Sequence, residues 1–277
     1  MAELPEVETT VRGLARVLEG RRITRVEARR ADLRRSFPKD LGQRLTGSKV
    51  VGLGRRAKYG LIHTDRDDTM IFHLGMSGSW RIDHAELGKH DHLLLETDEG
   101  IRLALNDPRR FGSVDLVSTV ELDQWPPFQA VAPDAIDLDV PGLQKRLSGR
   151  TAAIKLLLGD QSIVAGLGNI YVCEALHRAR IHPKRPGGSV SLERLSRLVV
   201  AIKEVLAEAV EAGGSTLPDF AALEAAGHKA SKLRGHSDRM WNTAVNALMA
   251  RHLAWTDIEV EAKAKNEAED LGRMLAG

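Results

Sequence analysis

The sequence contains one cysteine, no long apolar run and no signal-peptide pattern at its start. The single cysteine, Cys173, excludes an internal disulfide and a zinc site built from several thiolates. A membrane span needs roughly 18 or more consecutive apolar residues, and the chain has no such run. Together these absences predict a cytoplasmic protein that uses no disulfide.

The 277 residues are enough for two domains, and a hydrophobic content of 43% supports a packed core. The net charge is only +2, but charge is unevenly distributed. The first 58 residues hold 15 lysines and arginines against 7 acidic residues, whereas residues 59–100 are acidic. Such asymmetry indicates a polyanionic partner, although a solvated basic face has the same composition.

The first eight residues combine a small second residue with the start of a helix. Because Ala2 is small, we expect Met1 to be removed, which leaves an α-amine with a pKa of about 7.7–8.0 beside Glu3. Part of that amine is uncharged and nucleophilic at neutral pH. Pro5 suits the first turn of a helix. From these residues alone, an ordinary capped helix is the simpler interpretation.

Apolar periodicity predicts strands in the first half of the chain. An amphipathic helix is expected over residues 5–20, followed by strands over 23–30, 49–53, 59–63, 69–74, 92–96, 101–105 and 113–117. Short strands at this spacing favour a sandwich or a barrel. Trp125 and the two prolines after it are expected to break regular structure within a hinge over residues 119–141.

The second half is predicted to be helical. Helices are expected over residues 142–147, 152–158 and 169–180, and a longer one is expected from a cap at Ser191 to Gly213. Residues 221–277 are rich in Ala, Glu, Lys and Leu and are expected to add further helices. The predicted division is a β-rich domain (1–118), the hinge (119–141), a helical domain (142–220) and a tail (221–277).

Two motifs in the first half suit contact with nucleic acid. Arg55, Arg56 and Lys58 place three cations at the entry of a strand, which suits phosphate contacts or, equally, protection of an edge strand. The glycine loop His-Leu-Gly-Met-Ser-Gly displays Met76, a residue whose ordinary role is core packing.

Two later motifs have the same double interpretation. The turn Asn-Asp-Pro-Arg-Arg-Phe-Gly presents Arg109 and Phe111, which suit a wedge for a base stack, although a core anchor is the commoner role of such a phenylalanine. Gly166 and Gly168 precede a helix start near Asn169, which suits an anion, although a plain turn between helices has the same pattern.

In this order, the motifs closely resemble those of the formamidopyrimidine-DNA glycosylases, bacterial base-excision repair enzymes related to endonuclease VIII. The resemblance rests on Glu-Leu-Pro-Glu-Val-Glu at the start, the three motifs that follow, and Asp-Gln leading to Gly-Leu-Gly-Asn-Ile-Tyr. It extends over roughly residues 1–220. It implies an α+β fold: an N-terminal β-sandwich with a leading helix, then a helical domain with a helix-two-turns-helix motif.

The resemblance implies a glycosylase that removes oxidised purines, chiefly 8-oxoguanine and formamidopyrimidines, from duplex DNA. It also implies an abasic-site lyase that nicks the strand by β,δ-elimination through a Schiff base at the N-terminal amine. The implied catalytic residues are Ala2, Glu3 and Lys58. The implied DNA-binding residues are Met76, His92, Arg109, Phe111, Lys155 and Asn169. We expect a monomer that binds damaged or abasic double-stranded DNA and no membrane.

Two features depart from the family pattern. The family has proline at the second position, where this chain has Ala2, so the nucleophile becomes a primary amine. The family typically ends in a zinc finger with four cysteines, and no cysteine follows Phe220. His228, His236 and His252 do not have the spacing of a zinc site. We therefore expect no metal and no other cofactor.

These departures leave two functions open at this point. One is an active glycosylase and lyase with an altered nucleophile. The other is a catalytically weak or inactive relative that still binds damaged DNA or abasic sites.

Overall fold

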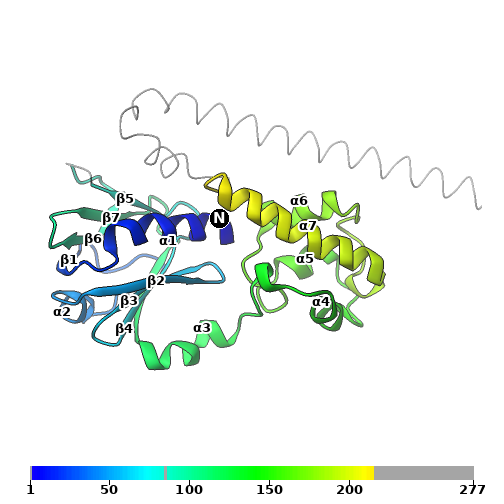
Figure 1. Cartoon of the computed structure of the whole chain (residues 1–277), viewed down its shortest axis with the longest axis horizontal. Helices are drawn as coiled ribbons and strands as arrows, with labels where there is room; N and C mark the ends of the chain where they lie inside the picture. The colour runs from blue at the N-terminus through cyan, green and yellow to red at the C-terminus, as the bar shows by residue number, and fades with distance from the viewer. Residues whose placement is uncertain (1, 84–85, 215–277) are drawn as a thin grey trace, which may run out of the picture. The chain divides into compact units, whose positions relative to one another are not determined.

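The computed structural model describes residues 2–83 and 86–214, and every structural statement below refers to them. Within these ranges, two antiparallel sheets follow a leading helix, and further helices follow the sheets (Figure 1). This is the mixed helix-and-sheet class that the sequence predicted. No helix of the described part is long and apolar enough to span a membrane.

The leading helix α1 (Leu4–Leu18) begins at a capping box. The Glu3 side chain accepts from the third residue of the helix, and the Glu6 side chain accepts from the Glu3 amide at 2.9 Å. Pro5 lies in the first turn, as predicted. The face made by Val7, Val11, Leu14 and Leu18 is buried, which confirms the apolar stripe read from the sequence.

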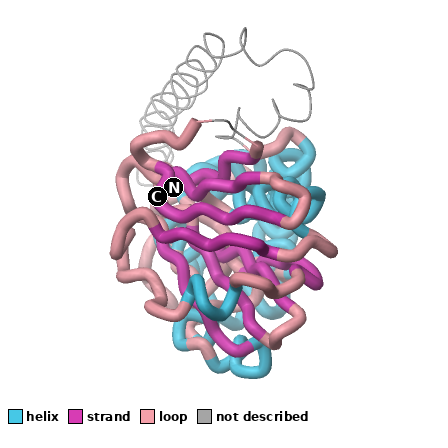
Figure 2. The backbone as a smooth tube through the Cα atoms, turned by 90° about the vertical axis from the view of Figure 1, so that its left-hand side faces the viewer, coloured by secondary structure: helices cyan, strands magenta, loops and turns pink. Residues whose placement is uncertain are grey.

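The strands form two sheets of four, seen as layers of strands in Figure 2. One sheet has the order β1-β6-β7-β5, with bounds Ile23–Ala28, Asp91–Thr97, Arg102–Asn106 and Ser79–Ile82. The other has the order β2-β3-β4-β8, with bounds Val50–Arg56, Tyr59–Thr64, Asp68–His73 and Ser113–Ser118. A short helix, α2 (Leu41–Leu45), lies between β1 and β2 in the sequence.

The main core of this part lies between the sheets. Phe72 of β4 and Trp80 of β5 come from different sheets and meet edge to face, with ring centroids 5.7 Å apart. Both side chains are fully buried. The sequence pattern does not predict β5, because its four residues are too few to establish an alternation and only Trp80 is buried.

The linker between sheets and helices is more regular than predicted. It contains the 3-10 helices η1 (Thr119–Gln124) and η2 (Ala135–Asp137) and the short helix α3 (Pro126–Gln129). The expectation that Trp125 and the prolines break regular structure was wrong at α3, because proline fits the first turn of a helix, where no amide donor is needed. Trp125 and Phe128 pack against β3 and β4 through Leu61 and Ile71.

The later helices are α4 (Val140–Leu147), α5 (Ile154–Gly159), α6 (Asn169–Arg178) and α7 (Leu192–Glu211), with a 3-10 turn, η3 (Gly187–Ser189), before α7. All four were expected, with bounds shifted by a few residues. They share a second apolar core, which Leu4 of α1 joins. The predicted domain limits stay a prediction, and the expected helices of the tail lie outside the described residues.

Candidate active site and DNA interface

Glu3 joins the leading helix to the start of α6. Its carboxylate accepts hydrogen bonds from the backbone amides of Gly168, Ile170 and Tyr171 at 2.7, 2.9 and 3.3 Å. The amides at a helix start have no partner within the helix, so a carboxylate satisfies them and favours the positive end of the dipole. Gly168 is required here, because a Cβ at that position would lie 2.5 Å from the carboxyl group of Glu3.

Glu6 holds Glu3 from the other side. One Glu6 oxygen accepts from the Glu3 amide, and the other accepts from the Tyr171 hydroxyl at 2.6 Å. All three residues are buried, with exposed fractions of 1–4%. This network fixes the second and third residues of the chain relative to α6, although a chain terminus is ordinarily frayed.

Burial shifts the pKa values of the charged groups in this network. Desolvation raises the pKa of Glu3, and the three amide bonds and the charge of Lys58 oppose that rise without cancelling it. Desolvation lowers the pKa of Lys58, and the charges of Glu3 and Glu6 oppose that fall. Each group therefore holds its neutral form over a wider pH range than it would in water.

Ala2 lies against the Met76 loop. Its nitrogen donates to the Gly75 carbonyl at 2.9 Å, and the residue is half-buried. The position expected to carry the reactive amine is therefore held between Glu3 and the loop that displays Met76. Met1, whose removal the sequence analysis expects, lies outside the described residues.

The Met76 loop and the Arg109–Phe111 turn form one unit. The Ser77 hydroxyl donates to Asp107 at 2.6 Å and accepts from the Arg109 amide at 3.2 Å. Gly75 has φ +63°, and a Cβ there would lie 2.4 Å from the Phe111 backbone, so only glycine allows the two segments to approach this closely.

The apolar tips of this unit face solvent. Met76 is 47% exposed and Phe111 is 45% exposed, and the Arg109 guanidinium lies 4.9 Å from the centre of the Phe111 ring. The core-anchor interpretation of Phe111 is therefore wrong. An exposed methionine and phenylalanine on a rigid, hydrogen-bonded unit match the wedge that enters a base stack.

His92 does not lie on the surface. It is 4% exposed, and its Nε2 is 3.0 Å from the Asp107 carbonyl oxygen, at the base of the same unit. Burial lowers its pKa, which favours the neutral ring. This placement gives His92 a supporting position under the loop that carries Arg109 and Phe111.

Of the three cations at the end of β2, Arg55 and Lys58 are buried, whereas Arg56 is 37% exposed and pairs with the exposed Asp123. Arg55 donates to Glu8 and to Asp134, both at 3.0 Å, and its side chain is 8% exposed. Neither interpretation of the motif fits Arg55, since its charge is matched inside the protein and reaches no surface. Sequence reasoning missed these acids because they lie 47 and 79 residues away.

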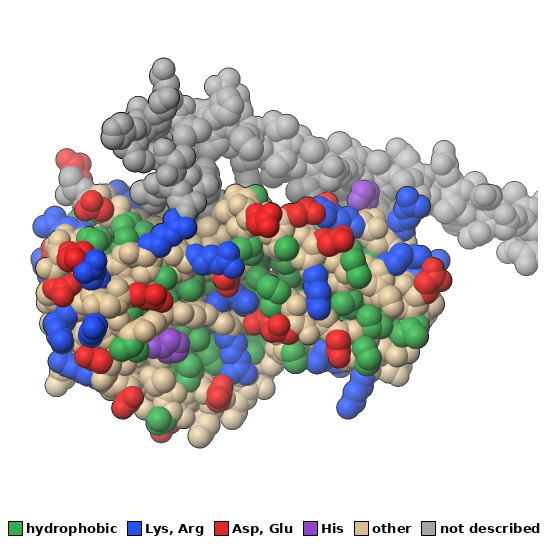
Figure 3. Space-filling model, viewed as in Figure 1, with side chains coloured by type: hydrophobic (Ala, Val, Ile, Leu, Met, Phe, Trp, Pro, Cys, Tyr) green, Lys and Arg blue, Asp and Glu red, His purple; other side chains and the backbone are tan. Residues whose placement is uncertain are grey.

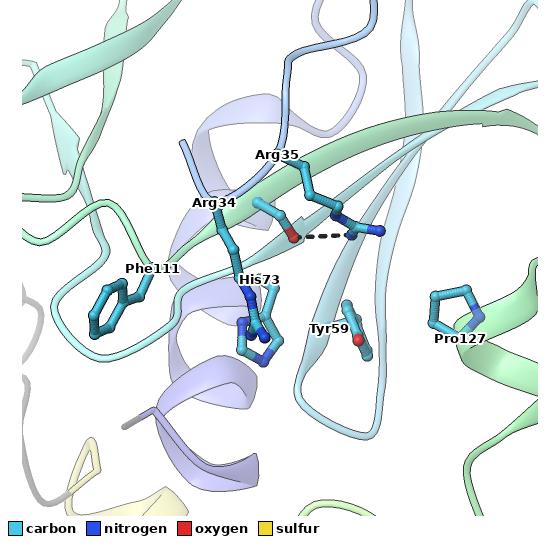
Figure 4. A pocket seen from close by; sticks show the side chains of 7 residues that line it. Arg34, Arg35, Tyr59, His73, Phe111 and Pro127 are labelled. Atoms are coloured by element: carbon cyan, nitrogen blue, oxygen red, sulfur yellow. Dashed lines mark hydrogen bonds between the residues drawn. The ribbon is translucent and has the colours of Figure 1, made fainter. Parts of the chain in front are cut away.

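A cavity of about 280 Å³ opens beside Phe111. Its lining brings together Arg34, Arg35, Tyr59, His73, Phe111, Ser113 and Pro127 (Figure 4). Arg35 donates to Ser113 and Asp115, at 3.2 and 2.6 Å. Burial together with the positive charges of Lys58, Arg34 and Arg35 lowers the pKa of His73 to about 4, and its Nδ1 accepts from the Gly75 amide. Arg34 and His73 were not among the predicted site residues. Only the basic composition of the first 58 residues pointed to Arg34.

The remaining predicted residues lie in the helical part. Asn169 is exposed and is the first residue of α6, between two amides that bind Glu3. Lys155 lies on α5 and is half-buried, with its backbone amide bonded to Pro183. The structure places Asn169 next to Glu3, and it places Lys155 on a separate helix.

Charges mix on the face seen in Figure 3, where lysines and arginines lie among acidic side chains. No cluster of three or more metal-ligating side chains occurs among residues 2–83 and 86–214. The histidines considered as zinc ligands lie outside those ranges, so the expectation of no metal stays a prediction.

Comparison with known proteins identifies the family. Residues 1–114 match the formamidopyrimidine-DNA glycosylase N-terminal domain, and residues 130–221 match the formamidopyrimidine-DNA glycosylase H2TH domain. The chain is 66% identical over 223 residues to a formamidopyrimidine-DNA glycosylase of Novosphingobium aromaticivorans, covering 80% of this chain and 83% of that protein. It is 51% identical to the one of Zymomonas mobilis, with the same coverage.

Solved structures agree. A complex of Lactococcus lactis Fpg with DNA containing FAPY-dG superposes with a TM-score of 0.73 at 34% identity, covering 78% of this chain and 82% of that chain. The MutM (Fpg) protein of Thermus thermophilus superposes with a TM-score of 0.70 at 36% identity, covering 79% of each chain. The chain therefore belongs to the formamidopyrimidine-DNA glycosylase family, the DNA glycosylases of base-excision repair.

Proposed function

We propose that this protein excises 8-oxoguanine and formamidopyrimidines from duplex DNA and nicks the resulting abasic strand by β,δ-elimination. The observation that carries the proposal is the buried carboxylate of Glu3, held by three amides directly beside the second residue of the chain. Membership of the family supports the glycosylase class. The alternative of an inactive relative is not favoured, because the matched relatives of up to 66% identity are named as glycosylases.

The exposed unit around Phe111 acts on the DNA stack. A damaged base must leave the helix before its glycosidic bond is accessible, at a cost of a few kcal/mol. Met76, Arg109 and Phe111 offset that cost by filling the gap. Their exposure and the hydrogen bonds that fix their loops support this role. His92 supports the loop through the Asp107 carbonyl.

The amine of Ala2 acts on the sugar. It attacks C1′, the base leaves, and the resulting Schiff base permits elimination of the flanking phosphates. Glu3 carries protons during ring opening and elimination, and burial raises its pKa toward the range that such a role needs. Ala2 lacks the ring that fixes the approach of a proline nitrogen, so we expect slower turnover than a proline would give.

Lys58 completes the proposed catalytic set, and Lys155 and Asn169 complete the proposed DNA-binding set. The charge of Lys58 acts on the Glu3 carboxylate, and Asn169 lies at the start of α6 next to the amides that bind Glu3. We propose that Lys155 contacts a phosphate from α5. The partner is double-stranded DNA with oxidised bases or abasic sites. The protein works as a monomer in the bacterial cytoplasm, without a metal.

Incubation with a duplex containing 8-oxoguanine opposite cytosine tests this function. We expect base release, strand nicking and, with borohydride, a covalent complex; an undamaged duplex of the same sequence is the control. Specific binding with neither base release nor trapping would contradict the proposal. Affinity for the undamaged duplex should fall steeply with salt, because phosphate contacts release counterions. Metal analysis of the purified protein should find no stoichiometric zinc.

A further inference from the structure

The helical part of the chain carries a local surplus of positive charge. Residues 140–189, from α4 to η3, contain eight lysines and arginines but only two acidic residues, Asp160 and Glu174. The whole chain has a net charge of only +2, so the surplus belongs to this part. A solvated basic face and a surface for a polyanion both have this composition, and the arrangement of the cations distinguishes them.

The loop that follows α4 brings two arginines together. The Nε of Arg150 donates to the carbonyl oxygen of Arg146 at 2.9 Å. The carbonyl oxygen of Arg150 in turn accepts from the amide of Gly188 at 2.8 Å, so the loop is held against η3. Arg150 is exposed, and Arg146 is half-buried.

The start of α5 adds two further cations at the same place. The Ile154 amide donates to the Arg185 carbonyl at 2.7 Å, and the Lys155 amide donates to the Pro183 carbonyl at 3.1 Å. Residues on either side of these bonds therefore lie next to each other, although they are about thirty positions apart in the sequence. We call the four cations held by these contacts the helical basic surface: Arg146, Arg150, Lys155 and Arg185.

Within residues 2–83 and 86–214, none of the four side chains of the helical basic surface makes an ion pair. Other arginines of the helical part are neutralised. Arg178 pairs with Glu174 and Glu208, and Arg197 pairs with Glu193. The acids of this part therefore serve other arginines and leave the surface with an uncompensated charge.

The acids close to the helical basic surface are bonded to other donors. Asp139 accepts from the Gly142 amide at 2.9 Å and caps α4. Asp160 accepts from the amide and the hydroxyl of Ser162, and these bonds are the main reason that its pKa is lowered. The charge of Arg150 acts on Asp160 only through space.

The helical basic surface lies at the opposite end of α6 from Glu3. The amides at the start of α6 bind the Glu3 carboxylate, and the loop that bonds to the start of α5 follows the end of α6. The ten residues of α6 span about 15 Å, at 1.5 Å per residue. Phosphates follow one another about every 3.4 Å along each strand of a duplex, so this distance corresponds to about four or five base pairs.

We propose that the helical basic surface binds backbone phosphates of the duplex about four or five base pairs from the lesion. The surface is continuous with Lys155, and it adds Arg146, Arg150 and Arg185 to the proposed DNA interface. Guanidinium groups suit this role because they bind phosphate oxygens with two parallel hydrogen bonds. Such contacts hold the duplex in register without reading its sequence. This inference rests on the proposed function, since it takes the same damaged duplex as the partner.

Substitution of two arginines tests the helical basic surface. The affinity of the natural protein, of Arg150→Gln, of Arg185→Gln and of the double variant is measured by fluorescence anisotropy over a series of salt concentrations. The probe is a long duplex with a tetrahydrofuran abasic-site analogue at its centre. A second duplex of the same sequence has uncharged methylphosphonate linkages about four to six base pairs from the analogue, on both sides and both strands. Arg197→Gln is the control, because Glu193 already matches that charge.

We expect each substitution to reduce the slope of log affinity against log salt concentration by about one, and the double variant by about two. On the methylphosphonate duplex, the natural protein and the variants should have the same slope. The same reductions should occur on an undamaged duplex, because phosphates carry no lesion information. Arg197→Gln should leave the slope unchanged.

An unchanged slope in the double variant would overturn the inference. Equal reductions on the charged and methylphosphonate duplexes would also overturn it, because the arginines would then contact another part of the duplex or a second duplex. Excision of 8-oxoguanine by the natural protein tests the proposed function separately. Excision with unaltered slopes in the variants would contradict the inference alone, whereas neither binding nor excision by the natural protein would contradict both.

Discussion

The buried network around Glu3 and the exposed unit around Phe111 are close in the structure but differ in how they are built. The carboxylates of Glu3 and Glu6 are enclosed, and they accept hydrogen bonds from Gly168, from residues of α6 and from the Glu3 amide. Phe111 and Met76 are nearly half exposed, and only their backbone and neighbouring polar groups are fixed. Under the proposed function, the difference means that folding alone completes the chemical centre, whereas the wedge is completed only when DNA binds.

The largest effect is expected at the buried centre, from Glu3→Gln. The amide cannot carry the proton that the proposed mechanism requires, so activity should fall by about 10²–10⁴-fold. Single-turnover excision of 8-oxoguanine measures the loss, with the exposed Glu204→Gln as control. Affinity for an abasic duplex should change much less. Equal losses of binding and excision would mean that Glu3 contributes to DNA binding and not mainly to the chemical step.

The next effect concerns stability at the buried ion pair of Arg55 and Asp134. Asp134→Asn removes the charge that faces Arg55 and weakens the hydrogen bond to the Ala57 amide. We expect the free energy of unfolding to fall by about 1.5–3 kcal/mol. Glu208→Gln is the matched control. Its pair with Arg178 has two bonds of 2.7 Å, but Glu208 is 60% exposed and solvent screens the pair, so a much smaller loss is expected. Urea unfolding measures the free energy of unfolding of both variants. Equal losses in Asp134→Asn and Glu208→Gln would contradict the prediction.

A smaller effect is expected at the wedge, where a substitution should weaken DNA affinity and leave stability almost unchanged. Phe111→Ala should leave the unfolding free energy within about 0.5 kcal/mol of wild type, because the side chain packs little within the protein. Affinity for an abasic duplex should weaken by about 1–3 kcal/mol, since a stacking surface is lost. Val120→Ala, at a residue 79% exposed, is the control. Destabilisation without a loss of affinity would assign Phe111 to packing.

The smallest effect is a pH-dependent change at Lys58. Since the pKa of Lys58 is lowered from 10.5 on folding, the unfolded chain binds more protons between the two values, and unfolding becomes harder as pH rises through that window. Lys58→Met removes this dependence. We expect the variant to be more stable near neutral pH, with a margin that narrows toward pH 10.5 in thermal unfolding scans. A stability difference between the variant and the unchanged protein that widens as pH rises would contradict the predicted direction.

The sequence specified the local elements well where the pattern was long. The stripe of Val7, Val11 and Leu14 predicted α1, and β-branched runs predicted seven strands. It failed at β5 and α3, which are four residues each and too short for a period to be read. The catalytic and DNA-binding residues came from the order of motifs, and their roles stay proposals until the variants above are measured.

By itself, the sequence determined the family, the leading helix and the residues that the glycine loops display, because these depend on neighbours within a few positions. Only the tertiary structure decided which charges meet. Glu3 meets amides 165 and more residues away, and Arg55 pairs with Asp134 rather than with solvent. Burial in turn set the pKa directions of Glu3 and Lys58, since desolvation depends on what encloses a group and not on its neighbours in sequence.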